Sequence, residues 1–236
     1  LIGIIAFLGG IAVALGAGGT LGGNGMVGEI KAKGSEVGGT VAPGNSIGAI
    51  HVTGTVNFDG LTYDVEIDHT GEADITTADG RIDLDGGSLN VVADPGVYSP
   101  ATTYKILSSA VGIYGHFGSI SDNLAFFDPS LLYEDNDVWL TILRNSLTLA
   151  DVAATQNQRS AADAIEQIGA GSPIYDGVLQ LDLDGAQLAF DMLSGEVHAT
   201  AKTLSVEDSR YVREAANDRL IAAQEEDGTR LWAKTF

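Results

Sequence analysis

Hydrophobic and polar residues alternate with a period of two through much of the first 145 residues. In LTYDVEID (61–68) the apolar side chains of Tyr63, Val65 and Ile67 alternate with polar ones, namely Thr62, Asp64, Glu66 and Asp68. Such alternation predicts half-buried strands. Turn residues separate the runs at 22–25, 59–60, 79–80 and 85–87. Their unequal spacing gives no strict repeat length, which favours an irregular β-helix over a propeller.

The first fifteen residues, LIGIIAFLGGIAVAL, are strongly apolar. They lack a positively charged flank and are interrupted by Gly3, Gly9 and Gly10, so we interpret them as buried strands rather than as a signal peptide or a membrane span. Because the chain starts without Met and in the middle of a pattern, we expect it to be a fragment of a longer protein.

A hairpin is predicted near residue 135. Leu131–Glu134 and Val138–Leu143 flank the turn Asp135-Asn136, with Val138, Leu140 and Ile142 on one face and Trp139 on the other. The end of a strand stack has unpaired edges and exposed apolar surface. We therefore expect this hairpin to close the open end of the stack.

The period becomes helical after Asn145, with the boundary near Leu149. Thr155 and Gln158 have the spacing of a capping box, and Gly169 follows the apolar positions Ala161, Ile165 and Ile168 as a helix end. Ser172-Pro173 predicts a second helix, with an apolar stripe formed by Ile174, Val178 and Leu181, and Asp184 with Gln187 predicts a third.

A last helix is predicted over about 206–224. It is polar on most faces, with Arg210, Arg213 and Arg219 placed among acidic residues. A free helix with so little apolar surface is marginal in water. We therefore expect a partner or a polar channel around it.

Three segments carry a family resemblance: GGTVAPGNSIGAIHVTGTV (38–56), GGSLNVVADPGVYSPATTYKIL (86–107) and NLAFFDPSLLYEDNDVWLTILRN (123–145). Their order and spacing resemble the pertactin-like autochaperone region of bacterial autotransporter passengers (type V secretion). Residues 156–182 and 193–220 resemble the helical linker between passenger and outer-membrane barrel. The resemblance covers almost the whole chain.

The resemblance implies a mainly β fold, a right-handed parallel β-helix (β-solenoid) whose end is capped by a hairpin-containing module, followed by an α-helical linker. It divides the chain into the last β-helix rungs of the passenger (1–37), an autochaperone-like cap (38–148), a helical linker (149–230) and the start of the first barrel strand (231–236, LWAKTF). In the family, the linker helix passes through the barrel.

The function implied is promotion of outer-membrane translocation and folding of a surface-exposed β-helix, such as that of an adhesin or virulence factor. The location implied for the protein is the surface or outer membrane of a Gram-negative cell, with release into the medium as an alternative. The partners implied are the protein's own C-terminal barrel, the upstream passenger, the barrel-assembly machinery and host surface receptors. The expected folding nucleus comprises Pro43, Gly44, Asn45, Ser46, Tyr104, Ile106, Val138, Leu140 and Ile142.

Two other functions stay open. The solenoid face could itself be an adhesin module that binds host receptors or neighbouring cells through exposed charges at Asp64, Glu66 and Asp68. The chain could also belong to a secreted hydrolase whose active site lies upstream. For the segment itself we expect no enzyme activity, no catalytic residue, no cofactor and no metal.

Composition narrows the choices further. A net charge of −20, from 12 basic and 32 acidic residues, repels phosphates and argues against nucleic-acid binding. The chain has no cysteine, so disulfides and thiolate sites are excluded. The four histidines, His51, His69, His116 and His198, lack the spacing of a metal site.

Three motifs match chemistry that their context does not support. Gly44–Gly48 fits the G-x-S-x-G nucleophile elbow around Ser46, and Gly23–Gly28 fits the dinucleotide motif G-x-G-x-x-G. Both motifs need a helix directly afterwards, whereas strand residues follow each of them. The acidic run 79–86 lacks the glutamate of an EF-hand, so we interpret it as outward-facing aspartates.

Overall fold

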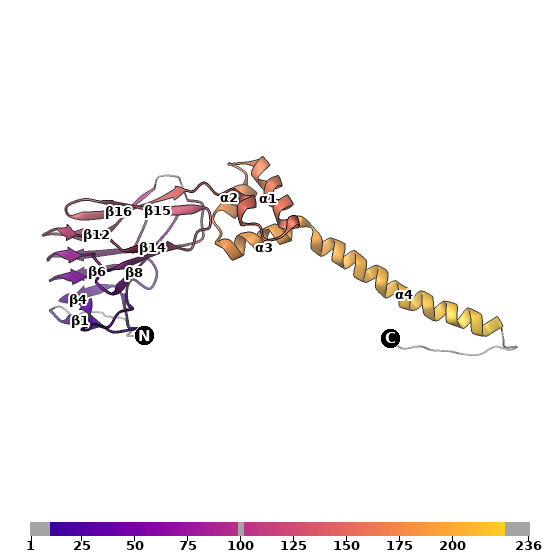
Figure 1. Cartoon of the computed structure of the whole chain (residues 1–236), viewed down its shortest axis with the longest axis horizontal. Coiled ribbons are helices and arrows are strands. Elements are labelled where there is room, and N and C mark those ends of the chain that lie inside the picture. Colours follow the sequence, from indigo (N-terminus) through magenta and orange to yellow (C-terminus); the bar gives the residue numbers. More distant parts are fainter. Residues whose placement is uncertain (1–9, 99–101, 225–236) are drawn as a thin grey trace.

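The computed structural model describes residues 10–98 and 102–224. A β-region comes first and a helical region follows, with the last helix extending away from the rest (Figure 1). The strands expected within residues 1–9 and the barrel strand expected at 231–236 lie outside the described residues.

The strands of the described residues form three sheets. The first contains, in spatial order, β1 (Ala12–Leu15), β4 (Glu29–Ala32), β7 (Val56–Asn57), β10 (Ile82–Asp83) and β13 (Ile113–Tyr114). The second contains β2 (Thr20–Gly23), β5 (Gly39–Pro43), β8 (Leu61–Ile67), β11 (Ser88–Ala93) and β14 (Ser119–Asp122). The third contains β3 (Gly25–Val27), β6 (Ala49–Val52), β9 (Ile75–Ala78), β12 (Thr103–Ser109), β16 (Asp137–Arg144) and β15 (Phe127–Tyr133).

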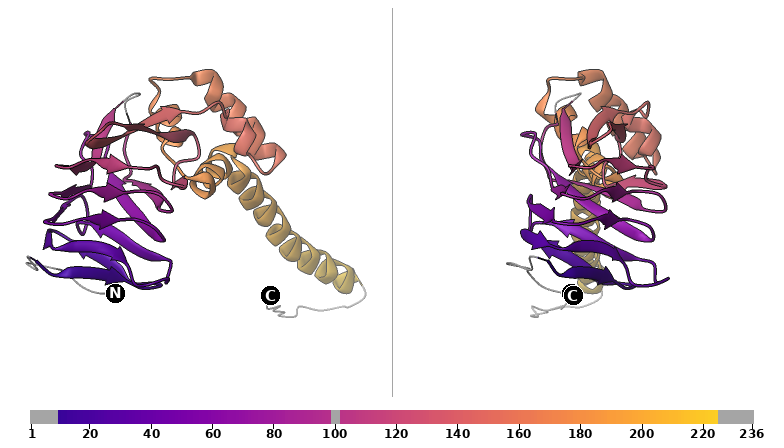
Figure 2. Two further views of the ribbon diagram at one scale, coloured as in Figure 1. Left: turned by 60° about the vertical axis from the view of Figure 1, so that its left-hand side comes forward. Right: turned by 90° about the vertical axis from the view of Figure 1, so that its left-hand side faces the viewer.

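Up to β14, each strand pairs in parallel with the strand three places further along the chain. The chain therefore visits the three sheets in turn and stacks each coil on the one before, as both views in Figure 2 show. The fold is mainly β, as predicted, and its parallel sheets are compatible with a parallel β-helix. Strand burial alternates as the period of two predicts, most clearly in β8.

The spacing from coil to coil is not constant, in agreement with the prediction of no strict repeat length: paired residues are 17 apart in β1 and β4, 20 in β2 and β5, and 22 in β5 and β8. Ile30 pairs with Val56 and Val56 with Ile82, and contacts between equivalent positions of these coils are separated by 26 residues. The next coil is longer, with a separation of 31 residues. A separation of 26 residues therefore holds only for some of the coils, which is why the sequence has no strict repeat length.

A column of glycines has this 26-residue spacing at the corner between the third and first sheets. A Cβ atom on Gly54 would lie 2.4 Å from the Gly28 carbonyl oxygen, and one on Gly80 would lie 2.5 Å from the Gly54 carbonyl oxygen. Such distances are far below van der Waals contact. Glycine is therefore required here by the close approach of successive coils.

The core runs along the axis of the coils. Ile30, Val56 and Ile82 stack from one coil to the next and are fully buried. Tyr63 is also fully buried, and its hydroxyl donates a hydrogen bond to the Ile106 carbonyl at 2.8 Å. Burial of the phenol raises the pKa of Tyr63. The hydroxyl thus bridges coils while the ring fills the core.

The predicted hairpin is confirmed. β15 and β16 pair antiparallel over their whole length, and β16 also pairs antiparallel with β12. Val138, Leu140 and Ile142 face the core, whereas Trp139 is only partly buried. At this end of the molecule the edge strand of the third sheet is β15, which carries Pro129. Proline cannot donate a backbone hydrogen bond, so it protects an edge strand against further pairing.

The helical region contains the 3-10 turn η1 (Leu149–Val152) and the helices α1 (Gln156–Ile168), α2 (Pro173–Leu179), α3 (Leu183–Ser194) and α4 (Glu196–Gln224). The predicted capping box at Thr155 and helix end at Gly169 are both present. The third helix starts earlier than predicted, because Asp182 rather than Asp184 caps it by accepting from the Gly185 N–H. The last helix starts at Glu196 instead of near 206, since Gly195 ends α3 in a left-handed conformation.

The apolar stripes of the first two helices are only partly as predicted. Ile165 and Val178 are buried, but Ile168 and Ile174 are exposed. Ala162 of α1 and Ala186 and Phe190 of α3 are fully buried, and the two helices pack against each other. This packing uses a narrower apolar face than the sequence pattern predicted.

The helices α1 to α3 lie against the β15–β16 end of the β-region, and α4 projects from them (Figures 1 and 2). Leu149 is fully buried, and its N–H donates to Glu166 Oε2 of α1 at 2.9 Å. Among the described residues, the helices include none with the length and apolarity needed to cross a bilayer.

Candidate functional site

The capped end of the β-region gathers five of the residues expected in the folding nucleus. Tyr104, Ile106, Val138, Leu140 and Ile142 are all at most 2% exposed. Tyr104 lies opposite Leu140 in the β12–β16 pairing, which is interrupted by a bulge at Ile106. The hairpin thus continues the third sheet while its inner face covers the apolar end of the last coil.

The other four expected residues lie elsewhere. Pro43–Ser46 form the corner between β5 and β6, two coils away from β12 in the third sheet. Gly44 adopts a positive φ of 81°, Pro43 is buried, and Asn45 and Ser46 are exposed. The nine residues therefore do not form one cluster, and their role as a folding nucleus stays a prediction.

The hairpin turn replaces the missing next coil. In lower coils, the Val56 and Ile82 N–H groups donate to carbonyls of the following coil, at Arg81 and Gly112. In the last coil, the Ile113 N–H donates instead to the Asp135 carbonyl at 2.8 Å. The turn thereby satisfies a strand N–H that would otherwise face outward unpaired.

Asn136 provides the second half of this cap. The Ser109 N–H donates to the Asn136 carbonyl at 2.8 Å, and Asn136 Nδ2 donates to the Ser109 carbonyl at 2.5 Å. Asn136 therefore pairs with both backbone groups of the residue at the end of β12, as a strand of another coil would.

Two further side chains act in the same way. Asn123 pairs with both backbone groups of Ala93 at the end of β11, through Oδ1 at 2.8 Å and Nδ2 at 3.1 Å. The Tyr133 hydroxyl accepts from the Phe117 N–H at 3.3 Å. Together, Asn123, Tyr133 and Asn136 form what we call the polar cap.

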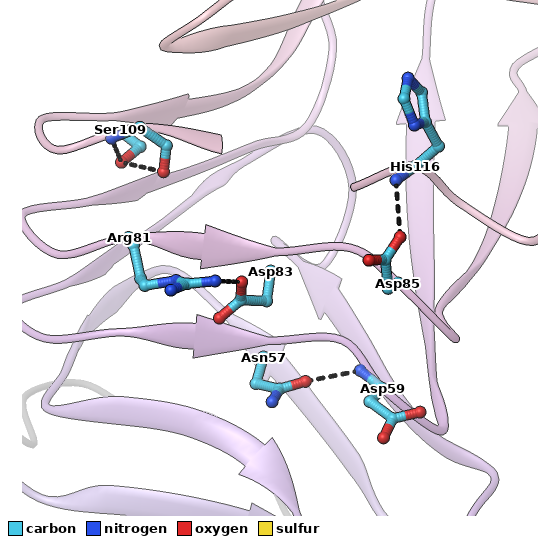
Figure 3. A network of polar contacts seen from close by, with 8 residues as sticks. Asn57, Asp59, Arg81, Asp83, Asp85, Ser109 and His116 are labelled. Atoms are coloured by element: carbon cyan, nitrogen blue, oxygen red, sulfur yellow. Dashed lines mark hydrogen bonds and ion pairs between the residues drawn. The ribbon is translucent and has the colours of Figure 1, made fainter. Parts of the chain in front are cut away.

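Ser109, the last residue of β12, contacts the glycine corner through its hydroxyl (Figure 3). Its hydroxyl donates to the Gly80 carbonyl at 2.8 Å and accepts from the Gly112 N–H at 2.8 Å. In the strand register Ser109 pairs with Ala78, so it is equivalent to Ala78 and Val52 of the coils below and not to the glycines of the column. Its hydroxyl joins the turn at Gly112 to the Gly80 corner.

Arg144 connects the cap to the helical region. At the end of β16, its guanidinium donates to the carbonyls of Phe126 and Asn145 at 3.0 Å and to that of Leu147 at 2.5 Å. It also lies over the Phe126 ring, 5.4 Å from the centroid. The chain therefore leaves the β-region in a fixed direction, five residues before the buried Leu149.

Sequence reasoning identified the apolar side of this site but missed its polar side. The hairpin turn containing Asn136 was predicted, but only as a turn. The signal that could have revealed the polar cap is the placement of Asn123 directly after β14 and of Asn136 in the hairpin turn directly before β16, where side-chain amides can imitate a backbone partner. The glycine column was recoverable from the 26-residue spacing of Gly28, Gly54 and Gly80.

A substitution tests the polar cap. In the Asn136→Ala variant, the Ser109 carbonyl loses its side-chain partner at the end of the stack. We expect the free energy of unfolding to fall by about 1–3 kcal/mol, measured by urea denaturation. Ser130→Ala, at an exposed position of β15, should change it by less than about 0.5 kcal/mol. If neither Asn136→Ala nor Ser130→Ala changes the free energy of unfolding, the polar cap does not stabilise the fold.

The motif matches do not form active sites. Ser46 is exposed and is followed by β6, and Gly23–Gly28 spans the corners of β2, β3 and β4, so neither serine nor glycines stand before a helix. In the acidic run, Arg81 pairs with Asp83, and Asp85 accepts from the His116 N–H at 3.2 Å (Figure 3). The described residues contain no group of three or more His, Asp or Glu side chains placed to hold a metal ion.

One row of side chains imitates a catalytic triad. His51 Nδ1 lies 3.0 Å from Thr77 Oγ1, and His51 Nε2 lies 3.4 Å from Asp79 Oδ2. These residues lie on the outer face of neighbouring strands, with the Asp79 side chain 60% exposed. Nucleophilic catalysis needs an enclosed site with oxyanion donors as well as a base, so we interpret the row as a surface hydrogen-bond ladder.

The fold and the site define a class: a stack of parallel β-coils closed by an antiparallel hairpin and followed by helices. The chain matches no model of a known protein family. It is 30% identical over 276 aligned residues to an extracellular serine protease of Serratia marcescens, a match that covers 92% of this chain and 26% of that protein. A second extracellular serine protease of the same organism is 28% identical over 283 residues, covering 97% of this chain and 26% of that protein.

These relatives correct one prediction. Both are named for an enzyme activity, which contradicts the expectation that the chain is not an enzyme and favours the alternative of a secreted hydrolase. The chain spans about a quarter of the length of each relative. Similarity to extracellular proteins of a Gram-negative bacterium agrees with the predicted surface or extracellular location at that coarse level.

Proposed function

We propose that this segment is a non-catalytic part of an extracellular serine protease of the autotransporter type, and that it promotes folding of the upstream passenger outside the cell. The observation that carries the proposal is the asymmetry of the β-region: one end is closed by the hairpin and the polar cap, while the other presents strands on which further coils can stack. We further propose that the coils wind as a right-handed β-helix.

The N-terminal end supplies the template. Within the described residues, β1, β2 and β3 are the outermost strands of the three sheets, each paired on one side by a strand of the next coil. Parallel strand edges of this kind are ready partners for added strands. Each added coil buries apolar surface worth about 25 cal/mol per Å², so folding on this template favours outward movement of the chain.

In this proposal the helical region links the β-region to the outer-membrane barrel. The helices α1 to α3 pack against one another and contact the β-region beside β14, where the Ala125 N–H donates to the Leu181 carbonyl at 3.2 Å. Most described side chains of α4 are exposed. Such a helix is suited to a polar channel, and we propose that it lies within the protein's own outer-membrane barrel, with the barrel-assembly machinery as a transient partner. Hydrolysis would reside in residues of the longer protein outside this segment.

The adhesin reading stays a prediction, as do virulence and host receptors. Asp64, Glu66 and Asp68 are half-buried rather than exposed, so charge reversal at these positions would not test adhesion alone. Asp68 in addition accepts hydrogen bonds from the Thr70 and Glu72 N–H groups at 2.9 Å and so holds its turn together. Reversal there would disturb the fold itself.

A deletion tests the proposal. In a full-length protein with its barrel and upstream passenger, removal of residues 38–145 should abolish protease-resistant passenger at the cell surface while the barrel still assembles. Resistance of the assembled barrel to unfolding in detergent provides the control. Unchanged display and unchanged protease resistance would contradict the proposed folding role and leave the segment as a simple stalk.

A further inference from the structure

A buried carboxylate fastens the corner between β5 and β6 to the neighbouring coil. Asp74 is 1% exposed. Its Oδ1 accepts from the Gly48 N–H at 2.7 Å, and its Oδ2 accepts from the Glu66 N–H at 2.9 Å. From the coil on the other side, Asn24 Oδ1 accepts from the Ala49 N–H at 2.6 Å. Side chains of two coils therefore hold the backbone of a third.

The surroundings of Asp74 are acidic. Glu66 of β8 and Asp94, just after β11, both act on its charge, and Tyr63 of β8 is the other titratable group coupled to it. The corner Gly44–Gly48 has no titratable side chain, and Asn24 is neutral. The groups that face Asp74 thus include two acids and no base, which is unfavourable for a buried negative charge.

We propose that Asp74 is a proton-responsive clasp between successive coils, which holds the β5–β6 corner most firmly when Asp74 carries a proton. A protonated carboxyl can still accept from the Gly48 and Glu66 N–H groups and no longer places a charge in the core. Loss of the proton leaves the hydrogen bonds but adds the cost of a buried charge beside Glu66. The clasp does not depend on the proposed role in secretion.

The electrostatic surroundings of Asp74 favour this direction. Burial, followed by repulsion from Glu66 and Asp94, raises the pKa of Asp74 from 3.8 to about 7, although the two N–H donors act in the opposite sense. Between these values the folded chain binds more protons than the unfolded chain, so stability is greatest at the acidic side of the window and falls as pH rises toward 7.

Urea unfolding of the whole 236-residue chain at several pH values tests the clasp. We expect the folding equilibrium constant to fall by at least about tenfold between pH 5 and pH 8. In Glu66→Gln, which removes one neighbouring charge, the fall should move to lower pH. Asp163→Asn, at an exposed carboxyl of α1, should leave the profile unchanged. If the folding equilibrium constant of Glu66→Gln depends on pH in the same way as that of the wild type, the proposal is overturned.

The carboxyl of Asp74 can also be followed directly in the folded wild-type chain, by carbon-detected NMR with Asp74→Asn used only for assignment. A midpoint well above that of Asp163 in the same sample supports the clasp. A midpoint at or below that of Asp163 overturns it, whatever the unfolding profiles show, since Asp74 would then be ionised throughout the range. This measurement stands even where Asp74→Asn fails to fold in quantity.

Discussion

The Leu140→Ala variant is expected to lose about 2–5 kcal/mol of unfolding free energy. Leu140 is fully buried on β16, opposite Tyr104 of β12 and Leu131 of β15. Truncation removes apolar contacts at the point where the hairpin covers the last coil, and the paired strands on both sides prevent the cavity from collapsing. Urea denaturation monitored by circular dichroism measures the loss.

Leu132→Ala provides the matched control for this prediction. Leu132 lies on the adjacent strand β15, is 58% exposed, and undergoes the same chemical change. Its unfolding free energy should stay within about 0.5 kcal/mol of the wild type. Similar losses in the two variants would show that the hairpin is not anchored by its inner face.

Gly54→Ala should be almost as damaging, although it adds only one methyl group. The new Cβ would lie 2.4 Å from the Gly28 carbonyl oxygen. The Cβ is held by the backbone of one coil and the oxygen belongs to the backbone of the next, so neither atom can rotate away. Overpacking of this kind costs about 1–3 kcal/mol or more. We expect a lower urea midpoint and weaker stacking of the coils on either side of the corner.

Gly177→Ala tests whether this effect comes from the close approach or from glycine replacement in general. A Cβ at Gly177 meets nothing within 4 Å, and its position inside α2 favours alanine by about 1 kcal/mol. The expected result is therefore a neutral or slightly more stable protein. A loss at Gly177 comparable to that at Gly54 would remove the glycine column from the explanation.

The sequence predicted those elements in which local pattern and tertiary packing agree. The alternation at Tyr63, Val65 and Ile67, the hairpin around residue 135 and the capping box at Thr155 depend on neighbouring residues alone, and the structure has each of them. The start of α4 was misplaced because Gly195 was not recognised as the end of α3. A polar helix gives little periodic signal by which its first turn can be located.

The site was less predictable because its defining contacts join distant residues. Asn136 meets Ser109 and Asp74 meets Gly48 across 27 and 26 residues. The positions of the two asparagines give a local hint, but which backbone groups they and Asp74 contact depends on how the coils stack. Pro43–Ser46 was recognised from its turn residues, but its separation from the hairpin depends on how the coils stack. The prediction about enzyme activity failed for a different reason, since the motif analysis concerned only this chain, which spans about a quarter of the length of its relatives.

The central claim, that packing at the capped end promotes folding of the upstream passenger, is tested most directly at the cell surface. Leu140→Ala and Leu132→Ala are introduced separately into the full-length protein, and protease-resistant surface passenger is measured against the amount of assembled barrel. The account predicts a marked loss for Leu140→Ala and a wild-type amount for Leu132→Ala. Equal amounts of resistant passenger in both variants, with Leu140→Ala destabilised in the isolated chain, would contradict it.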